Sequence, residues 1–225
     1  MTVDRRTFLA ALAATGLTVG RVSAMPTIVT PLPSLRPKSS GRRVVIVGGG
    51  WGGLAAARHL RDRAPDLEVV VIERNASFWS GPLSNRWLAG LVDTRYIVHE
   101  RMPAARAHGY DLIEAEVTAV DRDRRRVVTS VGTLDYDWLV LGVGIREDFR
   151  AWFGDDRRVA DLVRTRYPSA WIPGETLAVV KRKLDSFTGG DLLMTLPPMP
   201  YRCPPAPYER AALIGWLLRS RGIKG

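Results

Sequence analysis

A glycine-rich loop between a predicted strand and a predicted helix constrains the fold of this chain more than any other feature. Gly48, Gly50 and Gly53 follow the apolar, β-branched run at residues 43–47 and overlap the start of a helical pattern that continues through residues 54–64. In such a loop the first glycine permits a tight turn, the second lets a diphosphate approach the backbone, and the third lets the helix pack on the strand. Free N–H groups at the helix N-terminus also favour phosphate. We therefore predict a nucleotide-binding βαβ unit, with a purely structural glycine turn as the alternative.

A second predicted strand supplies an acid at the expected place. The apolar run at residues 67–73 indicates a buried strand, and Glu73 ends it about 20 residues beyond the loop. A carboxylate at this position accepts hydrogen bonds from ribose hydroxyls, so Glu73 is a candidate cofactor-binding residue. Arg74, which follows it, and Trp51, inside the loop, are further candidates. For Trp51 and Trp79, core packing is the simpler interpretation.

Three more strand signals follow an irregular region at residues 75–110. They lie at residues 111–121, 124–131 and 133–142 and are separated by turn residues. Strands inserted after the second strand of an N-terminal glycine fingerprint suit FAD, rather than NAD, in oxidoreductases with two dinucleotide-binding domains. We therefore expect FAD as the cofactor.

The last third of the chain has a different pattern. Residues 146–173 are polar and aromatic, which is typical of a connection. A helix is predicted at residues 174–187, a buried strand at residues 191–197, and a closing helix that begins at Pro207, a residue favoured at the first helical position. The first of these helices has three apolar residues on one face: Leu177, Val180 and Leu184.

These patterns predict an α/β fold. We expect a Rossmann-like FAD-binding domain with inserted strands at residues 42–150, and the start of a second Rossmann-like domain at residues 151–225. A helix that follows a buried strand normally leads to a further parallel strand, and the sequence has none left to add. We therefore expect a truncated chain or a partner that completes it. The proline- and serine-rich residues 25–41 are predicted to be a linker or extended arm.

Residues 1–24 have the pattern of an export signal. Arg5 and Arg6 precede Thr-Phe-Leu, a short apolar run follows, and residues 22–24 provide a small-residue cleavage site. Twin arginines indicate the Tat route, which exports folded proteins. The apolar run is too short for stable membrane insertion, although an uncleaved anchor is the alternative. We therefore expect a periplasmic protein.

The net charge of +10 comes almost wholly from arginine. The arginines are scattered and do not alternate with aromatic residues, which disfavours nucleic-acid binding. An acidic partner surface would suit this charge better, and a solvated arginine-rich surface is the simplest interpretation. His59, His99 and His108 follow no metal-binding spacing, so no metal is expected.

Cys203 is the only cysteine of the sequence and stands between Arg202 and two prolines. A free cysteine is commonly a small buried apolar residue, but a neighbouring cation such as Arg202 favours a reactive thiolate. Glu209 lies six residues further on, at the start of the closing helix, and could move a proton. An acid in the first turn of a helix is also ordinary helix design. Both interpretations of each residue remain open from the residues alone.

Four segments together resemble the flavoprotein subunit of flavocytochrome c sulfide dehydrogenase: "VVIVGGGWGG", "FWSGPLSN", "GTLDYDWLVLG" and "PYRCPPAPYERA". The resemblance implies FAD binding, with the backbone of Val117 near the adenine. It also implies that residues 133–144 are a second FAD motif containing Gly142 and Gly144. That motif usually ends in Ala-Thr-Gly or Ala-Pro-Gly, from which Gly142-Val143-Gly144 departs.

The resemblance further implies a redox disulfide beside the flavin between Cys203 and a cysteine from a later part of the chain. Hydrosulfide would attack this disulfide, and electrons would pass through FAD to a c-type cytochrome subunit. Some members of the family attach FAD through a cysteine just before Leu-Ser-Asn. Here Gly81 and Pro82 precede that triplet, so non-covalent FAD is expected. The second cysteine is absent from this sequence.

Two alternatives remain. One is a related flavin disulfide oxidoreductase that uses a quinone or NAD(P)H. The segment at residues 197–207 contains no glycine, which disfavours a second cradle for NAD(P)H. The other is a catalytically silent fragment that acts only as a binding or structural subunit.

Overall fold

The computed structural model describes residues 33–37 and 41–224. The predicted export signal at residues 1–24 lies outside the described residues, as does most of the predicted linker at residues 25–41. Of that linker, residues 33–37 and 41 are described, and the backbone of Leu35 and Pro33 is hydrogen-bonded to Thr133.

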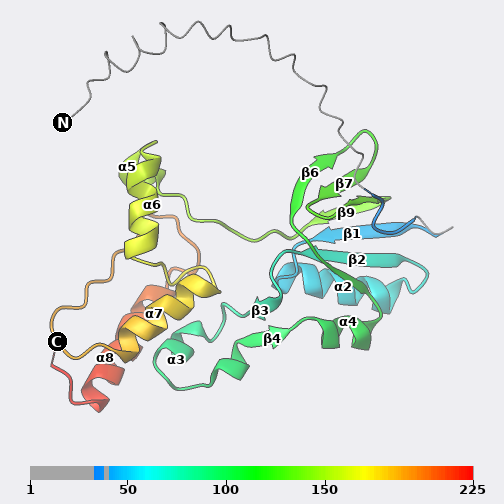
Figure 1. The fold of residues 1–225 in the computed structure, drawn as a ribbon. Coiled ribbons are helices and arrows are strands. Elements are labelled where there is room, and N and C mark those ends of the chain that lie inside the picture. Colours follow the sequence, from blue (N-terminus) through cyan, green and yellow to red (C-terminus); the bar gives the residue numbers. More distant parts are fainter. Residues whose placement is uncertain (1–32, 38–40, 225) are drawn as a thin grey trace, which may run out of the picture. The chain divides into compact units, whose positions relative to one another are not determined.

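A parallel four-stranded sheet forms the centre of the predicted nucleotide-binding unit (Figure 1). Its strands are β1 (Arg43–Val47), β2 (Glu68–Glu73), β5 (Asp111–Glu114) and β9 (Trp138–Leu141), in the order β5-β2-β1-β9. The predicted α/β fold with a Rossmann-like sheet is therefore confirmed. Because the strands are parallel, their carboxyl ends meet at one edge, where ligands of such sheets bind.

Both faces of β1 are covered, each by a different layer (Figure 1). Val44 and Ile46 pack in a core with helices α2 (Trp51–Arg63) and α4 (Met102–His108). Successive side chains of a strand point to opposite faces, and the next residue, Val45, packs in a second core with residues of the inserted strands. Those strands form an antiparallel sheet: β6 (Val117–Asp121), β7 (Arg126–Thr129) and β8 (Thr133–Asp135).

The three predicted strand segments correspond to five strands, which corrects the prediction. The segment at residues 111–121 divides because β5 belongs to the parallel sheet and β6 to the antiparallel one. The segment at residues 133–142 divides in the same way into β8 and β9. A strand that leaves one layer for another must turn, and neither turn is evident from the apolar pattern.

The region at residues 75–110, predicted to be irregular, contains short elements besides α4. Strands β3 (Ser77–Trp79) and β4 (Val98–Glu100) pair antiparallel. Helix α3 (Ser84–Leu88) and the 3₁₀ turn η1 (Thr94–Tyr96) lie between them in the chain.

The predicted connection at residues 146–173 contains two helices, α5 (Arg150–Phe153) and α6 (Arg157–Arg166), which corrects that prediction. Helix α7 (Glu175–Asp185) and helix α8 (Ala206–Ser220) confirm the two predicted helices, although α8 begins one residue before Pro207. Among the described residues no helix is both long and apolar enough to cross a membrane.

Helices α3, α7 and α8 share a third core. Leu177 and Leu184 are buried there, and Val180 packs against them, so the predicted apolar face of α7 is confirmed. Trp87 from α3 and Ile214 from α8 complete the contact.

The predicted buried strand at residues 191–197 is wrong. The structure assigns no strand there, and Leu193 is 87% exposed. A strand needs a neighbour to satisfy its backbone N–H and C=O groups. In the described part of the chain, no strand pairs with this segment.

A buried arginine ties the start of β1 to its surroundings. Arg43 is fully buried, and its Nε and Nη2 donate to the carboxylate of Glu68 at 2.8 and 3.0 Å. Its guanidinium also donates to the carbonyl oxygens of Arg36, Pro37 and Asp135. One side chain therefore joins β1 to β2, to the end of β8 and to residues 36–37.

Candidate functional site

The glycine-rich loop lies at the carboxyl ends of three neighbouring strands. Gly48 follows β1, and its N–H donates to the carbonyl oxygen of Ile72 in β2 at 2.8 Å. Gly142 follows β9, and its N–H donates to the carbonyl oxygen of Val47 at 2.8 Å. Gly142 and Gly48, predicted from distant motifs, are thus brought together.

The three fingerprint glycines differ in what the fold requires of them. A Cβ on Gly53 would lie 1.8 Å from the carbonyl oxygen of Gly48, and a Cβ on Gly48, which has φ +104°, would lie 2.3 Å from that of Gly142. Both positions therefore need glycine for folding. Gly50 has φ −86°, and a Cβ there would meet no atom within 4 Å. The fold alone thus gives no steric reason for glycine at position 50.

Helix α2 presents its N-terminus at this open position. Gly50 is the N-cap, no side chain caps the helix, and its first turn has no acidic residue. Uncapped N–H groups and the positive end of the helix dipole favour an anion such as a diphosphate. The loop is therefore chemically suited to a dinucleotide.

The Glu73 carboxylate lies beside the loop. One of its oxygens accepts from the Gly49 N–H at 2.7 Å, and the other accepts from the backbone N–H and the side-chain amide of Asn75 at 2.9 and 2.7 Å. Burial raises the pKa of Glu73, but the hydrogen bonds from Asn75 and Gly49 and the charge of Arg101 outweigh it and hold that pKa below its usual value. The carboxylate is therefore ionised at neutral pH, and both of its oxygens act only as acceptors.

The sequence analysis missed Arg101. This side chain is only 6% exposed, and its Nε donates to the carbonyl oxygen of Gly49 at 2.9 Å, while Nη1 donates to that of Asn75 at 2.5 Å. Nothing in the sequence marks it, because Arg101 is 52 residues from Gly49 and belongs to no motif.

Trp51 is 60% exposed, so the prediction that it packs in the core is wrong. The buried residues of α2 are Gly53 and Ala57, and the side chain of Trp51 instead contacts Phe78 edge to face at 5.4 Å. Trp79 behaves as predicted, packing against the third core with its ring 5.9 Å from that of Trp87.

The remaining predicted cofactor residues lie after the same strands. Arg74 is exposed, and its Nη1 lies 3.5 Å from a carboxylate oxygen of Glu116. Val117 begins β6, two residues after Ala115, whose N–H donates to the carbonyl oxygen of Glu73. Gly144 follows β9 with φ +76°.

Cys203 is exposed, so its interpretation as a buried apolar residue is wrong. It has φ +54°, a left-handed conformation that is uncommon for a residue with a side chain. Its carbonyl oxygen accepts from the N–H of Ala206, the first residue of α8. The segment therefore holds the thiol at the surface, just before a helix.

Glu209 takes part in a polar network between α3 and α8. Its carboxylate accepts from the Asn85 side-chain amide at 2.6 Å, and Asn85 accepts from Arg210 Nε at 2.9 Å. Arg210 also donates to the carbonyl oxygen of Ala170 at 3.0 Å. Burial lowers the pKa of Arg210, and the neighbouring Glu209 and Cys203 oppose this effect.

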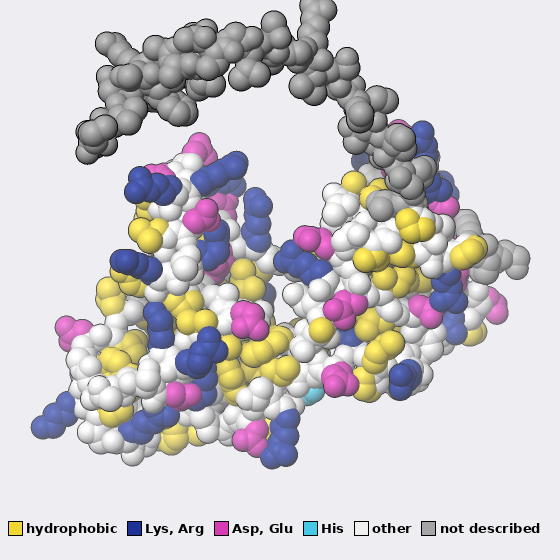
Figure 2. Space-filling model, viewed as in Figure 1, with side chains coloured by type: hydrophobic (Ala, Val, Ile, Leu, Met, Phe, Trp, Pro, Cys, Tyr) yellow, Lys and Arg dark blue, Asp and Glu magenta, His cyan; other side chains and the backbone are white. Residues whose placement is uncertain are grey.

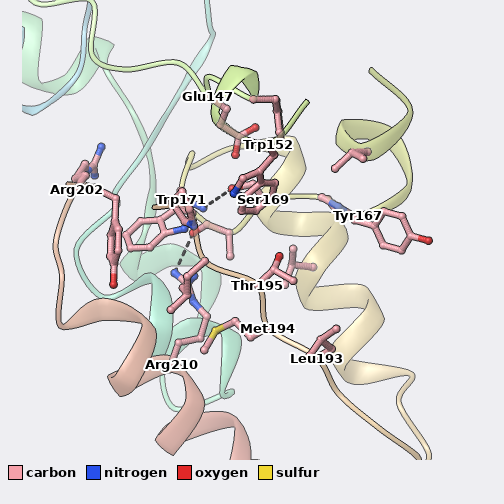
Figure 3. Close-up of a pocket in the computed structure, with 18 of the residues that line it drawn as sticks. Glu147, Trp152, Tyr167, Ser169, Trp171, Leu193, Met194, Thr195, Arg202 and Arg210 are labelled. Atoms are coloured by element: carbon pink, nitrogen blue, oxygen red, sulfur yellow. Dashed lines mark hydrogen bonds between the residues drawn. The ribbon is translucent and has the colours of Figure 1, made fainter. Parts of the chain in front are cut away.

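A cavity of about 640 Å³ lies beside this network (Figure 3). The guanidinium carbon of Arg210 lies over the Trp171 ring, 5.4 Å from the ring centroid. The centroids of the Trp171 and Tyr201 rings are 5.7 Å apart. Apolar and aromatic side chains dominate the lining, which also includes four cations, Arg146, Lys183, Arg202 and Arg210. Within residues 33–37 and 41–224, no group of His, Cys, Asp and Glu is arranged to hold a metal ion. On the face shown in Figure 2, the Lys and Arg side chains are spread among acidic ones.

Comparisons with known proteins match two parts of the chain. The family model for pyridine nucleotide-disulphide oxidoreductase matches residues 42–165. A second model, for the central part of the sulfide dehydrogenase [flavocytochrome c] flavoprotein chain, matches residues 177–224.

Similar individual proteins include a sulfide-quinone reductase from Aquifex aeolicus, 25% identical over 185 residues, which cover 81% of this chain and 41% of that protein. A type II NADH:quinone oxidoreductase from Staphylococcus saprophyticus is 25% identical over 48% of this chain and 27% of its own length. The crystal structure of the sulfide:quinone oxidoreductase from Aquifex aeolicus superposes with a TM-score of 0.55 and 25% identity over 64% of this chain and 32% of that one. The chain spans less than half the length of these relatives.

Proposed function

Because this chain belongs to the pyridine nucleotide-disulphide oxidoreductase family, we propose that residues 42–150 bind FAD non-covalently and that the chain is the flavin-carrying part of a sulfide-oxidising enzyme. The proposal combines the geometry of the glycine-rich loop with the match of residues 177–224 to the central part of a sulfide dehydrogenase flavoprotein.

The open space at Gly50 is the observation that carries FAD binding. Gly48 and Gly53 are explained by close packing of the backbone. Nothing in the described fold crowds position 50 or position 52, but of these two only Gly50 is the N-cap in front of α2. A ligand that approaches the backbone in front of α2 accounts for glycine there. The N–H groups of α2 would hold the diphosphate, and Glu73 would accept from the ribose. Once bound, FAD supplies a two-electron acceptor for the substrate. Gly81 and Pro82 stand where some members of the family that the sequence resembles attach the flavin, which supports non-covalent binding.

Cys203 is the residue proposed to react with sulfide. Its sulfur and the sulfur of hydrosulfide would join as a persulfide, with the two electrons going to FAD and the hydrosulfide proton going to the solvent or to a nearby base. It is exposed, lies beside Arg202 and falls within the segment matched to the sulfide dehydrogenase flavoprotein. Cations near a thiol favour the thiolate, which is the reactive form. Glu209 would assist by moving a proton, but its carboxylate would first have to release Asn85.

A c-type cytochrome is the proposed electron acceptor, and export by the Tat route to the periplasm is part of the same proposal. A quinone is the second candidate, because two of the similar proteins are named for quinone reduction. The acidic partner that the net charge of +10 suits is compatible with a cytochrome partner.

The test begins with the purified chain incubated with FAD and then freed of unbound flavin. We expect a visible flavin spectrum, and acid precipitation should release all the flavin into the supernatant. A protein that remains colourless would refute FAD binding, and flavin that stays with the precipitate would refute its non-covalent attachment.

Sulfide is then added to the flavin-loaded chain without oxygen, first alone and then with cytochrome c or a soluble quinone. Bleaching of the visible band, lost in Cys203→Ser, is expected for sulfide oxidation at Cys203. The faster acceptor identifies the physiological class. Equal bleaching in Cys203→Ser would exclude that residue from the reaction.

A further inference from the structure

Two backbone segments, at Gly49 and at Asn75, are each hydrogen-bonded to both Glu73 and Arg101. Gly49 donates its N–H to Glu73, and its carbonyl oxygen accepts from Arg101 Nε at 2.9 Å. Asn75 likewise donates its N–H to Glu73, and its carbonyl oxygen accepts from Arg101 Nη1 at 2.5 Å. Glu73 and Arg101 therefore bind the same two residues, one through their donors and the other through their acceptors.

The fit around Arg101 is close. A Cβ on Gly49 would lie 2.9 Å from Arg101 Nε and 3.0 Å from Glu73 Cβ, so the glycine at position 49 makes room for both side chains. Phe78 lies against the guanidinium, 5.9 Å from its ring centre. Burial lowers the pKa of Arg101, and the nearby Glu73 opposes this effect. An arginine remains charged in a protein in any case.

We propose that Arg101 is a positioning residue for the dinucleotide, holding Gly49 so that the N–H groups of the loop face the diphosphate. The proposal rests on the proposed FAD site. Arg101 does not touch the open space at Gly50; it acts through the carbonyl oxygen of Gly49 and through Glu73. A loop fixed before the ligand arrives does not have to be ordered on binding, and such preorganisation increases affinity.

Arginine is suited to this role because its planar guanidinium donates in two directions at once. The two carbonyl oxygens that it binds belong to segments separated by β2, one before the strand and one after it. A lysine keeps the charge but has a single nitrogen on a flexible stem. The substitution Arg101→Lys therefore removes the two-point grip and preserves the charge opposite Glu73.

The experiment compares the full chain with Arg101→Lys and Arg101→Met. The matched controls are Arg106→Lys and Arg106→Met, at an exposed arginine of α4 only five residues away. Two quantities are measured: the Kd for FAD, and the amide hydrogen exchange of residues 48–53 in the flavin-free protein. Both are measured at a temperature well below the thermal unfolding midpoint of each variant, so that differences in global stability do not affect either quantity.

We expect both Arg101 variants to bind FAD at least about tenfold more weakly, since hydrogen bonds to charged groups are the stronger ones. The loop amides should exchange faster in these variants, while the Arg106 controls match the wild type. If Arg101→Met does not fold, Arg101→Lys decides the test alone. Wild-type affinity with wild-type loop protection in Arg101→Lys would overturn the positioning role only. A wild-type chain that binds no FAD would overturn the proposed function, and this role with it.

Discussion

Replacing Gly50 with alanine tests whether glycine at this position is required for ligand binding or for folding. The backbone at position 50 has φ −86°, which any residue adopts, and the new methyl group would meet no atom within 4 Å. Alanine is a poorer N-cap than glycine, but it also lowers the entropy of the unfolded chain. These effects oppose each other, so we expect the free energy of unfolding to change by less than about 1 kcal/mol.

The same methyl group would occupy the space through which a diphosphate approaches the backbone. Inserting a methyl group into a close contact typically costs about 1–3 kcal/mol. Since about 1.4 kcal/mol corresponds to a factor of ten, Gly50→Ala should weaken FAD binding between about fivefold and 150-fold. The methyl group should therefore weaken the FAD complex without destabilising the flavin-free chain.

Two neighbouring glycines provide matched controls. A Cβ on Gly52 also meets no atom within 4 Å, and Gly52 lies inside α2, so Gly52→Ala should stabilise the chain by up to about 1 kcal/mol and leave FAD affinity unchanged. A Cβ on Gly53 would lie 1.8 Å from the carbonyl oxygen of Gly48, so Gly53→Ala should lower the free energy of unfolding of the flavin-free chain by about 3 kcal/mol or more.

The assay is urea unfolding of each flavin-free variant, together with titration of FAD into the folded protein. Gly50→Ala should change the titration and not the unfolding curve, whereas Gly53→Ala should change the unfolding curve itself. If Gly50→Ala bound FAD as tightly as Gly52→Ala does, the open space at position 50 would not be the diphosphate site, and the reasoning would fail.

Three further predictions follow from the described contacts. Arg43→Met should lower the free energy of unfolding, measured by urea titration, by about 3 kcal/mol. This is the lower end of the range for breaking a buried ion pair, because Glu68 keeps Arg36 as a partner. An unchanged urea midpoint would contradict this prediction. The pKa of Glu73 in the folded chain lies below its usual value, so the unfolded chain binds the proton first as the pH falls. The free energy of unfolding should therefore decline below about pH 4.3, and urea titrations at several pH values should show a smaller decline for Glu73→Gln than for the wild type. The exposed Cys203 thiol should react completely with a disulfide reagent in the folded chain, and a thiol that reacts only after denaturation would argue against the described surface position.

The sequence predicted the nucleotide-binding half of the fold well, because that half is encoded locally. The glycine spacing, the run at residues 43–47 and the acid at residue 73 are each set by neighbours within the βαβ unit. The strand at residues 191–197 was predicted incorrectly because its apolar pattern is only one condition for a strand. The other condition is a partner for its backbone, which depends on residues far away in the chain.

Arg101 and Asn85 show why parts of the site escape sequence analysis altogether. Each acts by bonding to a residue more than 50 positions away, Arg101 to Gly49 and Asn85 to Glu209. No periodicity or spacing indicates such a pair, since their separation is fixed by the path of the chain between them. Glu209 illustrates the consequence: the sequence alone leaves open whether it moves a proton or is an ordinary helix-start acid.

The contact of Glu209 with Asn85 changes the balance between these two interpretations. The carboxylate accepts a hydrogen bond of 2.6 Å from an amide that is itself fixed by the buried Arg210. A group that carries protons must exchange partners in every cycle, and here each exchange would free an amide that joins α3 to α8. The loss of such a bond costs about 1–3 kcal/mol when the group left behind is buried. Holding α8 against α3 is therefore the primary role of Glu209 in this structure, and a role in proton transfer would require that contact to open.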